Sequence, residues 1–238
     1  ADAFALGRTF AALALERGAR RIAVGRDGRT HSPGLEAALV RGLAEGGVNV
    51  VRIGMGPSPM LYFAVHHLHA DGGIQVTGSH NPADYNGFKM LLGGASVHGA
   101  AIQDLGQRCA AGEWSAGHAE VSDAEVLGAY VDRLVEDFRG GRFRIGWDAG
   151  NGAAGPALQR LAERLPGEHH VLHAEVDGTF PNHHPDPTVE ANLADLKALV
   201  AAKQLDFGIA FDGGGDRIGA VDGRGRAIWG DKLLAILA

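Results

Sequence analysis

Two halves of this chain repeat the same order of short apolar run, glycine-containing loop and helical pattern. In the first half, residues 21–27 read R-I-A-V-G-R-D, and a loop leading to Pro33 follows. In the second half, residues 144–148 read R-I-G-W-D, and a glycine-rich loop leading to Pro156 follows. Further along each half, residues 73–77 and 208–212 run into a polar loop. The repetition predicts a duplicated unit with its boundary near residues 140–141.

Helical and apolar segments alternate along both halves. We expect helices over residues 6–18, 35–43, 60–68, 103–111, 124–138, 156–165 and 192–202. We expect strands over residues 21–25, 48–53, 74–77, 87–92, 143–147, 170–176, 207–211 and 218–221. Strands separated by helices favour an α/β fold, here two similar three-layer domains with mixed, mostly parallel sheets. Open sheets of this kind bind ligands at the carboxyl ends of their strands, so the loops after the strands are candidate sites.

Composition and net charge exclude several classes of protein. Glycine accounts for 37 of 238 residues without a three-residue period, which excludes a collagen-like chain. The net charge of −6 argues against nucleic acid or an anionic membrane as a partner. The single cysteine excludes a disulfide framework, and no secretory or membrane-spanning apolar run is evident. We therefore expect a cytoplasmic protein, and the sequence does not indicate its oligomeric state.

The segment 77–82, T-G-S-H-N-P, is the sharpest candidate site. It places Ser79 on an exposed tight turn just after a buried strand, flanked by glycine and Asn-Pro. A serine there can act as a nucleophile or phosphate carrier if a base or metal activates it. The alternative is that Ser79 is an ordinary turn residue and His80 a surface residue.

A second candidate segment, 212–217, reads D-G-G-G-D-R. Asp212 and Asp216 on a glycine-rich turn after a strand suit a hard divalent cation such as Mg²⁺. Arg217 could then pair with a phosphate oxygen. The alternative is a solvated acidic turn between two strands.

Two further patterns are weak. Residues 150–155 match G-x-G-x-x-G, but no acidic residue in a ribose-binding context follows, so dinucleotide binding is a minor alternative. Two histidine groups lack zinc-motif spacing, and we expect their members to be surface or packing residues: His66, His67, His69, His169, His170 and His173.

Together these segments resemble the α-D-phosphohexomutases, the phosphoglucomutase/phosphomannomutase group. Residues 77–82 resemble that family's phosphoserine loop, residues 86–89 (N-G-F-K) its downstream partner, and residues 212–217 its metal loop. The segments at 24–27, 148–152, 177–183 and 230–232 are also similar to family segments. The resemblance spans nearly the whole chain, and the serine loop is its most specific part.

The resemblance implies both an architecture and a reaction. The family has four domains, and this chain would supply a phosphoserine-loop domain over residues 1–140, a metal-loop domain over 141–226 and the start of a third over 227–238. The family's first strand has no counterpart before residue 1, so the chain is expected to be a fragment. Phosphorylated Ser79 would exchange a phosphoryl group with a hexose monophosphate through a bisphosphorylated sugar. His80, Lys89 and Arg217 would assist catalysis.

One position departs from the family pattern, in which the metal loop reads Asp-Gly-Asp-Gly-Asp-Arg. Gly214 stands where the middle aspartate is expected. The resemblance implies Mg²⁺ held by Ser79, Asp212, the Gly214 position and Asp216. The missing carboxylate predicts a reduced affinity for Mg²⁺ and impaired or absent mutase activity.

Three functions remain open. The first is a mutase interconverting hexose 6-phosphate and hexose 1-phosphate, with glucose or mannose favoured by the T-G-S start of the serine loop. The second is a truncated or degenerate module that binds a sugar phosphate or a partner without turnover. The third is a Mg²⁺-dependent phosphatase with an aspartate nucleophile, which the serine loop disfavours.

Overall fold

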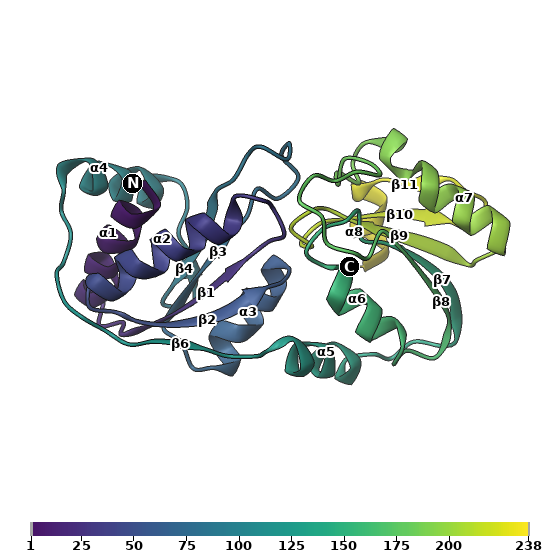
Figure 1. Cartoon of the computed structure of the whole chain (residues 1–238). Coiled ribbons are helices and arrows are strands. Elements are labelled where there is room, and N and C mark those ends of the chain that lie inside the picture. Colours follow the sequence, from purple (N-terminus) through teal and green to yellow (C-terminus); the bar gives the residue numbers. More distant parts are fainter. Residues whose placement is uncertain (1, 238) are drawn as a thin grey trace. The chain divides into compact units, whose positions relative to one another are not determined.

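The computed structural model describes residues 2–237, which form two compact units (Figure 1). Unit 1 runs to Thr77 and resumes over Asn86–Val126. Unit 2 comprises Gly78–Tyr85 together with the chain from Leu127 onward. The loop that carries Ser79 therefore packs with the second unit, although the strand before it belongs to the first.

Unit 1 is built on a mixed six-stranded sheet in the order β5-β4-β3-β1-β2-β6. Its strands are β1 (Arg21–Arg26), β2 (Asn49–Met55), β3 (Gly72–Val76), β4 (Phe88–Leu92), β5 (Ala95–Ser96) and β6 (Val121–Asp123). β1 pairs in parallel with β2 and β3, and β2 pairs in parallel with β6. β4 runs antiparallel to both β3 and β5. This sheet is mostly parallel, as expected.

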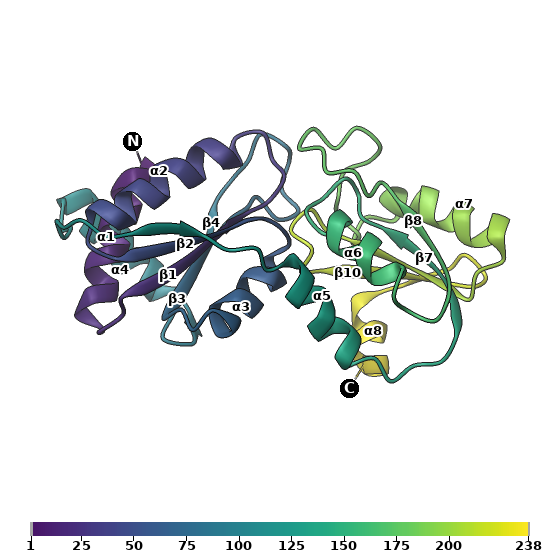
Figure 2. The same ribbon diagram turned by 60° about the horizontal axis from the view of Figure 1, so that its bottom comes forward.

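Helices cover both faces of this sheet (Figure 2). They are α1 (Asp2–Glu16), α2 (Ser32–Glu45), α3 (Ser58–His67) and α4 (Ala100–Ala111). Alternation along β1 divides the core, because Ile22 and Val24 pack in a fully buried cluster with side chains of α1 and α2. α3 packs on the other face, where Gly73 lies against Leu61 and Val65. Proline in the first turn fixes the starts of α2 and α3.

Unit 2 repeats the strand order of unit 1. Its sheet runs β11-β10-β9-β7-β8. The strands are β7 (Phe143–Asp148), β8 (Gly167–Leu172), β9 (Phe207–Phe211), β10 (Ile218–Asp222) and β11 (Ala227–Ile228). β7 is parallel to β8 and β9, while β10 is antiparallel to β9 and β11. The series β10-β9-β7-β8 thus matches β4-β3-β1-β2, which confirms two similar α/β units with mixed sheets. The loops after β3 and β9 are equivalent.

Helices α6 (Gly155–Ala162) and α7 (Ala194–Lys203) cover the two faces of the second sheet, and the 3-10 turn η1 (Glu190–Leu193) precedes α7. α5 (Leu127–Glu136) packs beside α6, and α8 (Gly230–Leu237) is the last helix of the described residues. Ile145 and Trp147 pack beneath α6. On the opposite face Gly146 and Gly208 let α7 approach, since a Cβ there would lie 3.1 and 2.8 Å from the Leu196 side chain.

The structure shifts or adds several elements. The expected strand 170–176 is instead Gly167–Leu172, because His173 adopts a left-handed backbone, φ 49°, which ends the strand. The expected helix 124–138 is shorter, Leu127–Glu136, and residues 124–126 separate it from the edge strand β6, which ends at Asp123. The strands of two or three residues were not predicted, because such short segments carry no measurable periodicity, and α8 was not predicted either.

The last helix, α8, exposes apolar side chains. Leu234 is 70% exposed, Ile236 67% and Leu237 73%. Between residues 2 and 237, no helix is both long enough and apolar enough to cross a bilayer.

Candidate active site

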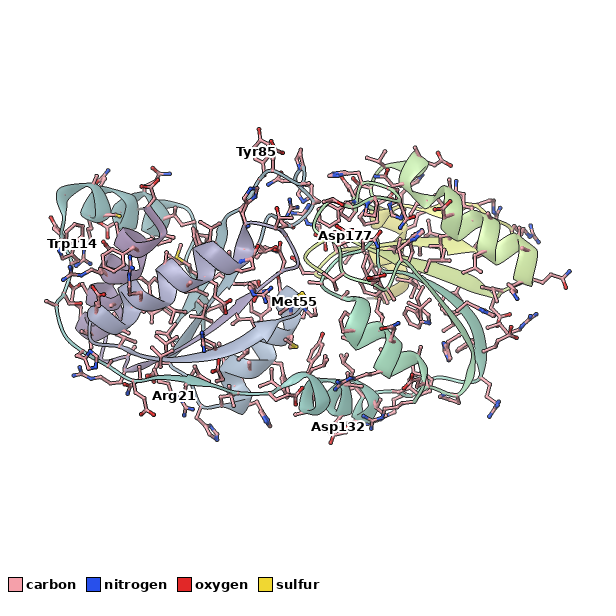
Figure 3. All side chains as sticks on the ribbon, viewed as in Figure 1. Arg21, Met55, Tyr85, Trp114, Asp132 and Asp177 are labelled. Atoms are coloured by element: carbon pink, nitrogen blue, oxygen red, sulfur yellow. The ribbon has the colours of Figure 1, made fainter. Side chains whose placement is uncertain are left out.

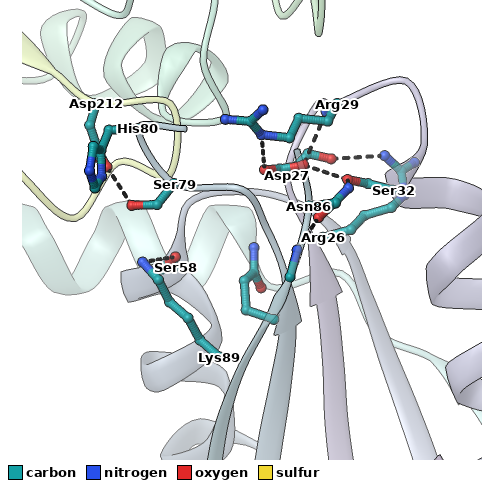
Figure 4. Close-up of polar contacts among 12 residues, drawn as sticks. Arg26, Asp27, Arg29, Ser32, Ser58, Ser79, His80, Asn86, Lys89 and Asp212 are labelled. Atoms are coloured by element: carbon teal, nitrogen blue, oxygen red, sulfur yellow. Dashed lines mark hydrogen bonds and ion pairs between the residues drawn. The ribbon is translucent and has the colours of Figure 1, made fainter. Parts of the chain in front are cut away.

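Ser79 and Asp212 meet in unit 2, although 133 residues separate them in the sequence. Ser79 follows β3 in a left-handed conformation, φ 53°, and Asp212 directly follows β9. The Ser79 hydroxyl donates a hydrogen bond to Asp212 Oδ2 at 2.9 Å (Figure 4). Asp212 is fully buried, and Ser79 is only 9% exposed. The expectation that Ser79 lies on an exposed turn was therefore wrong, because the serine packs against the acidic loop. The contact joins the serine loop to the acidic loop, as their equivalent places after β3 and β9 lead one to expect.

The acidic loop is organised around the Asp212 carboxylate. Its Oδ1 accepts hydrogen bonds from the backbone N–H groups of Asp216 at 3.0 Å and Arg217 at 3.2 Å. The Asp212 backbone N–H donates to the Arg217 carbonyl at 3.1 Å, and Gly215 turns the chain with φ 69°. A buried carboxylate is costly unless it is hydrogen-bonded, and three donors here meet that requirement. The turn from β9 to β10 therefore holds this carboxylate in one orientation.

Gly213 allows the two loops to touch through their backbones. A Cβ at this position would lie 2.7 Å from the Ser79 carbonyl oxygen, closer than real Cβ contacts occur. The Gly213 N–H donates to the Pro185 carbonyl at 3.2 Å, and its carbonyl accepts from the Ala153 N–H at 3.2 Å. Glycine is required at this position by the close approach of the serine loop.

His80 is held by two neighbouring side chains, those of Arg217 and His184. The Arg217 guanidinium donates to His80 Nε2 at 3.4 Å, and His184 Nε2 contacts the His80 carbonyl oxygen at 2.8 Å. His80 Nδ1 is buried without a hydrogen-bond partner among the described residues. Nearby Asp186 is half-buried, which opposes its ionisation, but hydrogen bonds from Thr188 lower its pKa. The serine loop thus lies in a polar setting, in which the Arg217 guanidinium contacts His80 and the Asp212 carboxylate contacts Ser79.

The structure places six of the seven predicted site residues in unit 2: Ser79, His80, Asp212, Gly214, Asp216 and Arg217. Lys89 lies on β4 in unit 1, opposite Gln75 of β3, and its Nζ donates to Ser58 Oγ at 3.4 Å. Tyr85, on the rim of the serine loop, points outward and is 57% exposed (Figure 3). Ser79, Asp212 and Asp216 carry only oxygen donors in their side chains, the type of ligand that Mg²⁺ prefers, and Gly214 adds no side-chain ligand.

A buried ion pair organises the loop after β1 in unit 1. Arg29 Nε lies 3.2 Å from Asp27 Oδ2, and both side chains are almost completely buried. The same carboxylate accepts hydrogen bonds from the Ser32 hydroxyl and the Arg29 backbone N–H. Asn86 Nδ2 donates to Ser32 Oγ at 2.8 Å, so the segment after the serine loop is tied to this network (Figure 4). Sequence reasoning noted both segments but could not reveal that their side chains meet.

Sequence reasoning also missed a second polar cluster in unit 2. Within residues 2–237, Asp148, His173 and His183 are grouped so that one ligand atom from each lies within 4.8 Å of the others. His183 Nε2 lies 3.0 Å from Asp148 Oδ2, and this hydrogen bond raises the pKa of the His183 imidazole. These three side chains could hold a metal ion. Their separations along the chain match no zinc motif, which is why spacing alone did not indicate them.

Comparisons with known proteins agree with this arrangement. The family described as "Phosphoglucomutase/phosphomannomutase, alpha/beta/alpha domain I" matches residues 1–115. The family described as domain II of the same proteins matches residues 128–225. A phosphoglucomutase of Neisseria gonorrhoeae is 43% identical over 99% of this chain and 52% of its own length. A phosphomannomutase/phosphoglucomutase of Pseudomonas putida is 41% identical over 99% of this chain and 51% of its own.

A solved structure of a relative has the same fold as this chain. The crystal structure of a phosphoglucomutase/phosphomannomutase family protein from Burkholderia thailandensis superposes with a TM-score of 0.94 at 41% identity. The match covers 99% of this chain and 53% of that one, so the chain spans about half the length of the relatives it matches. Since both family descriptions and the relatives cover nearly the whole chain, this protein belongs to the phosphoglucomutase/phosphomannomutase family.

Proposed function

We propose that this chain carries the phosphoserine and the acidic loop of a phosphohexomutase, which interconverts hexose 6-phosphate and hexose 1-phosphate. The observation that carries the proposal is the hydrogen bond of 2.9 Å from the Ser79 hydroxyl to the buried Asp212 carboxylate. A hydroxyl fixed in this way keeps one orientation, which favours in-line phosphoryl transfer. The names of the relatives, phosphoglucomutase and phosphomannomutase/phosphoglucomutase, support the reaction.

The reaction is an exchange that needs no external phosphate donor once Ser79 is phosphorylated. In the first transfer, the bond between Ser79 Oγ and phosphorus breaks while a sugar hydroxyl oxygen bonds to phosphorus. The proton of that hydroxyl passes to a protein base, and Ser79 Oγ regains a proton. The sugar then carries two phosphates, and the reverse transfer of the other one restores phosphorylated Ser79. The net result is isomerisation.

Three polar side chains have supporting roles in this proposal. Arg217, which reaches the His80 ring at 3.4 Å, neutralises phosphate charge. His80 orients a sugar hydroxyl or the phosphoserine. Lys89 assists the proton transfer or stabilises the transferring group.

Mg²⁺ fits the donor atoms of the acidic loop. Ser79, Asp212 and Asp216 would hold it, with a water or backbone oxygen at the Gly214 position. When bound, it supplies Lewis-acid neutralisation of the phosphoryl charge. Because Gly214 replaces a carboxylate, we expect weaker binding than a loop with three aspartates gives.

We further propose that residues 1–140 correspond to the phosphoserine-loop domain and residues 141–226 to the metal-loop domain, with residues 227–238 opening a third. Glucose and mannose phosphates are the favoured substrates. The T-G-S start of the serine loop and the names of the relatives support this choice.

A turnover assay tests the proposal. The protein is mixed with glucose 1-phosphate, Mg²⁺ and a trace of glucose 1,6-bisphosphate, and glucose 6-phosphate is measured. The wild-type chain should produce glucose 6-phosphate, and Ser79→Ala should lower the rate by more than roughly 1,000-fold because the phosphate carrier is lost. Ser96→Ala, an exposed serine in β5, is the matched control and should leave the rate unchanged. Equal rates for the Ser79→Ala and Ser96→Ala proteins would exclude the mutase mechanism.

A second candidate is a module that binds sugar phosphate without turnover, and Gly214 favours it because the acidic loop lacks one carboxylate. It predicts binding of glucose 1-phosphate by calorimetry with no glucose 6-phosphate formed. Formation of glucose 6-phosphate by the wild-type chain would exclude it.

A further inference from the structure

Asp148, His173 and His183 bring two imidazoles and one carboxylate together at the carboxyl ends of β7 and β8. One ligand atom from each lies within 4.8 Å of the other two. The closest pair is His183 Nε2 and Asp148 Oδ2, which are 3.0 Å apart. The cluster is separate from the oxygen donors of Ser79 and Asp212, and the proposed mutase mechanism does not use it.

Both imidazoles are oriented by a second acceptor. His183 Nδ1 lies 3.0 Å from the His184 carbonyl oxygen, and a carbonyl can only accept, so Nδ1 carries the proton there. His173 Nε2 lies 3.0 Å from Asp195 Oδ2. His183 Nε2 donates to Asp148 Oδ2 in the metal-free protein, so a metal ion bound there would displace that proton to solvent. His173 Nδ1 keeps its lone pair when Nε2 carries the ring proton toward Asp195. Metal-binding histidines are oriented in this way, by donating their other N–H to a carboxylate or carbonyl.

The carboxylate is equally well fixed. Asp148 is fully buried, and its Oδ1 accepts a hydrogen bond from the Gly150 backbone N–H at 2.9 Å. Its Oδ2 faces His183, whose side chain is only 14% exposed. A buried carboxylate needs a positive partner, either a proton on the facing imidazole or a metal ion between the two groups.

The backbone at His173 is in an uncommon conformation. His173 has φ 49°, and its carbonyl accepts a hydrogen bond from the Asn151 N–H at 2.9 Å. A residue other than glycine in the left-handed region costs about 1 kcal/mol or more and persists where its surroundings fix it, often at binding sites. The side chain is only 16% exposed and lies edge-on to the His183 ring, with centroids 5.3 Å apart.

We propose that Asp148, His173 and His183 bind one Zn²⁺ ion. Two imidazole nitrogens and one carboxylate oxygen are donors that Zn²⁺ accepts and that Mg²⁺, which prefers oxygen ligands, does not favour. Water completes the fourth position of a tetrahedral site. Ligand atoms around such an ion lie roughly 3.3 Å apart, given Zn–N and Zn–O distances near 2.0–2.2 Å, so small side-chain rotations close the cluster.

Zinc at this position would brace the segment that supports the serine loop. His183 is followed directly by His184, whose Nε2 contacts the His80 carbonyl oxygen at 2.8 Å. A bound ion would join this segment to the ends of β7 and β8. The proposed effect of the ion is to hold this segment in place, and it is tested by binding and stability rather than by turnover.

The experiment is titration of Zn²⁺ into the metal-free chain, in excess Mg²⁺ so that the oxygen ligands of the acidic loop are already occupied. Calorimetry and metal analysis should give one Zn²⁺ per chain, and differential scanning calorimetry should show a zinc-dependent rise in Tm. Co²⁺ in place of Zn²⁺ should give the visible absorption of a tetrahedral site. No Zn²⁺ binding under these conditions would overturn the proposal.

Matched variants locate the ion. His173→Asn removes an imidazole but retains a residue tolerant of positive φ, and it should weaken Zn²⁺ binding by more than about 10-fold. Asp195→Asn, which alters only the group that orients His173, should weaken it by roughly 10–100-fold. The control is His170→Asn, because His170 also faces a carboxylate, Glu168 at 2.7 Å, but belongs to no group of three possible ligands among residues 2–237. If all three variants bind Zn²⁺ as tightly as the wild type does, the ion lies elsewhere and the proposal is overturned.

Discussion

The Ser79 hydroxyl donates to Asp212 Oδ2 at 2.9 Å, and the other oxygen of that carboxylate accepts two backbone N–H groups of its own loop. The carboxylate therefore serves two purposes. Oδ1 closes the turn between β9 and β10, while Oδ2 fixes the serine side chain. Since Asp212 is fully buried, its contacts are not exchanged with water.

This division of roles predicts the behaviour of Asp212→Asn. The amide keeps one oxygen for the backbone donors, so we expect the fold to persist with a loss of about 1–3 kcal/mol in the free energy of unfolding. Phosphorylation of Ser79 by glucose 1,6-bisphosphate should slow by roughly 100-fold or more, because the negative charge beside the hydroxyl is lost. Urea denaturation and quenched phosphorylation assays measure the two effects.

Asp222→Asn is a matched control. Asp222 Oδ1 also accepts two backbone N–H groups, from Arg224 at 3.0 Å and Arg226 at 2.9 Å, but it is remote from the serine loop in the sequence and contacts no serine in the described hydrogen bonds. Its substitution should leave phosphorylation of Ser79 unchanged. Similar slowing in both variants would show that the Ser79 contact has no special importance.

Gly213→Ala tests the close approach of the loops. The new Cβ would lie 2.7 Å from the Ser79 carbonyl oxygen, and backbone must move to relieve the contact. We expect a loss of about 1–3 kcal/mol in stability and a marked fall in Ser79 phosphorylation, measured by calorimetry and mass spectrometry. In the control Gly230→Ala, the Cβ meets no atom within 4 Å. If both variants behave like the wild type, the loops do not need this contact.

Gly214→Asp should strengthen Mg²⁺ binding by adding a carboxylate to the oxygen donors of Asp212 and Asp216. Calorimetric titration of Mg²⁺ into the wild-type and variant chains measures the change directly. We expect the variant to bind at least several-fold more tightly, because ligand charge tunes affinity at such sites. Identical affinities would show that position 214 does not contribute to the metal site.

Glu36 predicts a pH dependence of stability in unit 1. Burial raises its pKa above the ordinary value of 4.5, and the guanidinium of Arg26, 3.0 Å away, offsets only part of the shift. The folded state therefore holds this proton more tightly than the unfolded state does. The resulting stabilisation is present below pH 4.5 and is lost as the pH rises through the folded-state pKa.

The corresponding variant is Glu36→Gln, which stays neutral at every pH. The stability of the wild type relative to this variant should fall as the pH rises from 4.5 through the folded-state pKa of Glu36. Urea denaturation of both proteins across that range measures it. Glu45→Gln, an exposed position on the same helix, is the control and should show a smaller change. A constant difference for Glu36→Gln would contradict the raised pKa.

Local patterns predicted most of the fold. The apolar runs before Asp27, Thr77, Asp148 and Asp212 were recognisable as strands, and the repeated order of runs and loops indicated two similar units. The expected strand at 170–176 was misplaced because His173 leaves the extended conformation, and its propensity does not reveal this. The edge strand β6 is only three residues long and depends on its pairing with β2.

The repeated order of strands and loops also predicted part of the candidate active site. Equivalent places after β3 and β9 indicated that Ser79 and Asp212 belong to corresponding loops. No local pattern could indicate that Asp148, His173 and His183 converge, because the loop between β8 and α7 brings them together without regular spacing. Likewise, the ion pair of Asp27 with Arg29 becomes visible only as a buried contact in the folded unit.

The most direct test of the account is the location of phosphate on the protein. The chain is incubated with glucose 1,6-bisphosphate and Mg²⁺, and its peptides are then mapped by mass spectrometry. The account predicts one phosphate per chain, carried by Ser79 and absent from the Ser79→Ala variant. Phosphate on an aspartate, or no phosphate on Ser79, would contradict it.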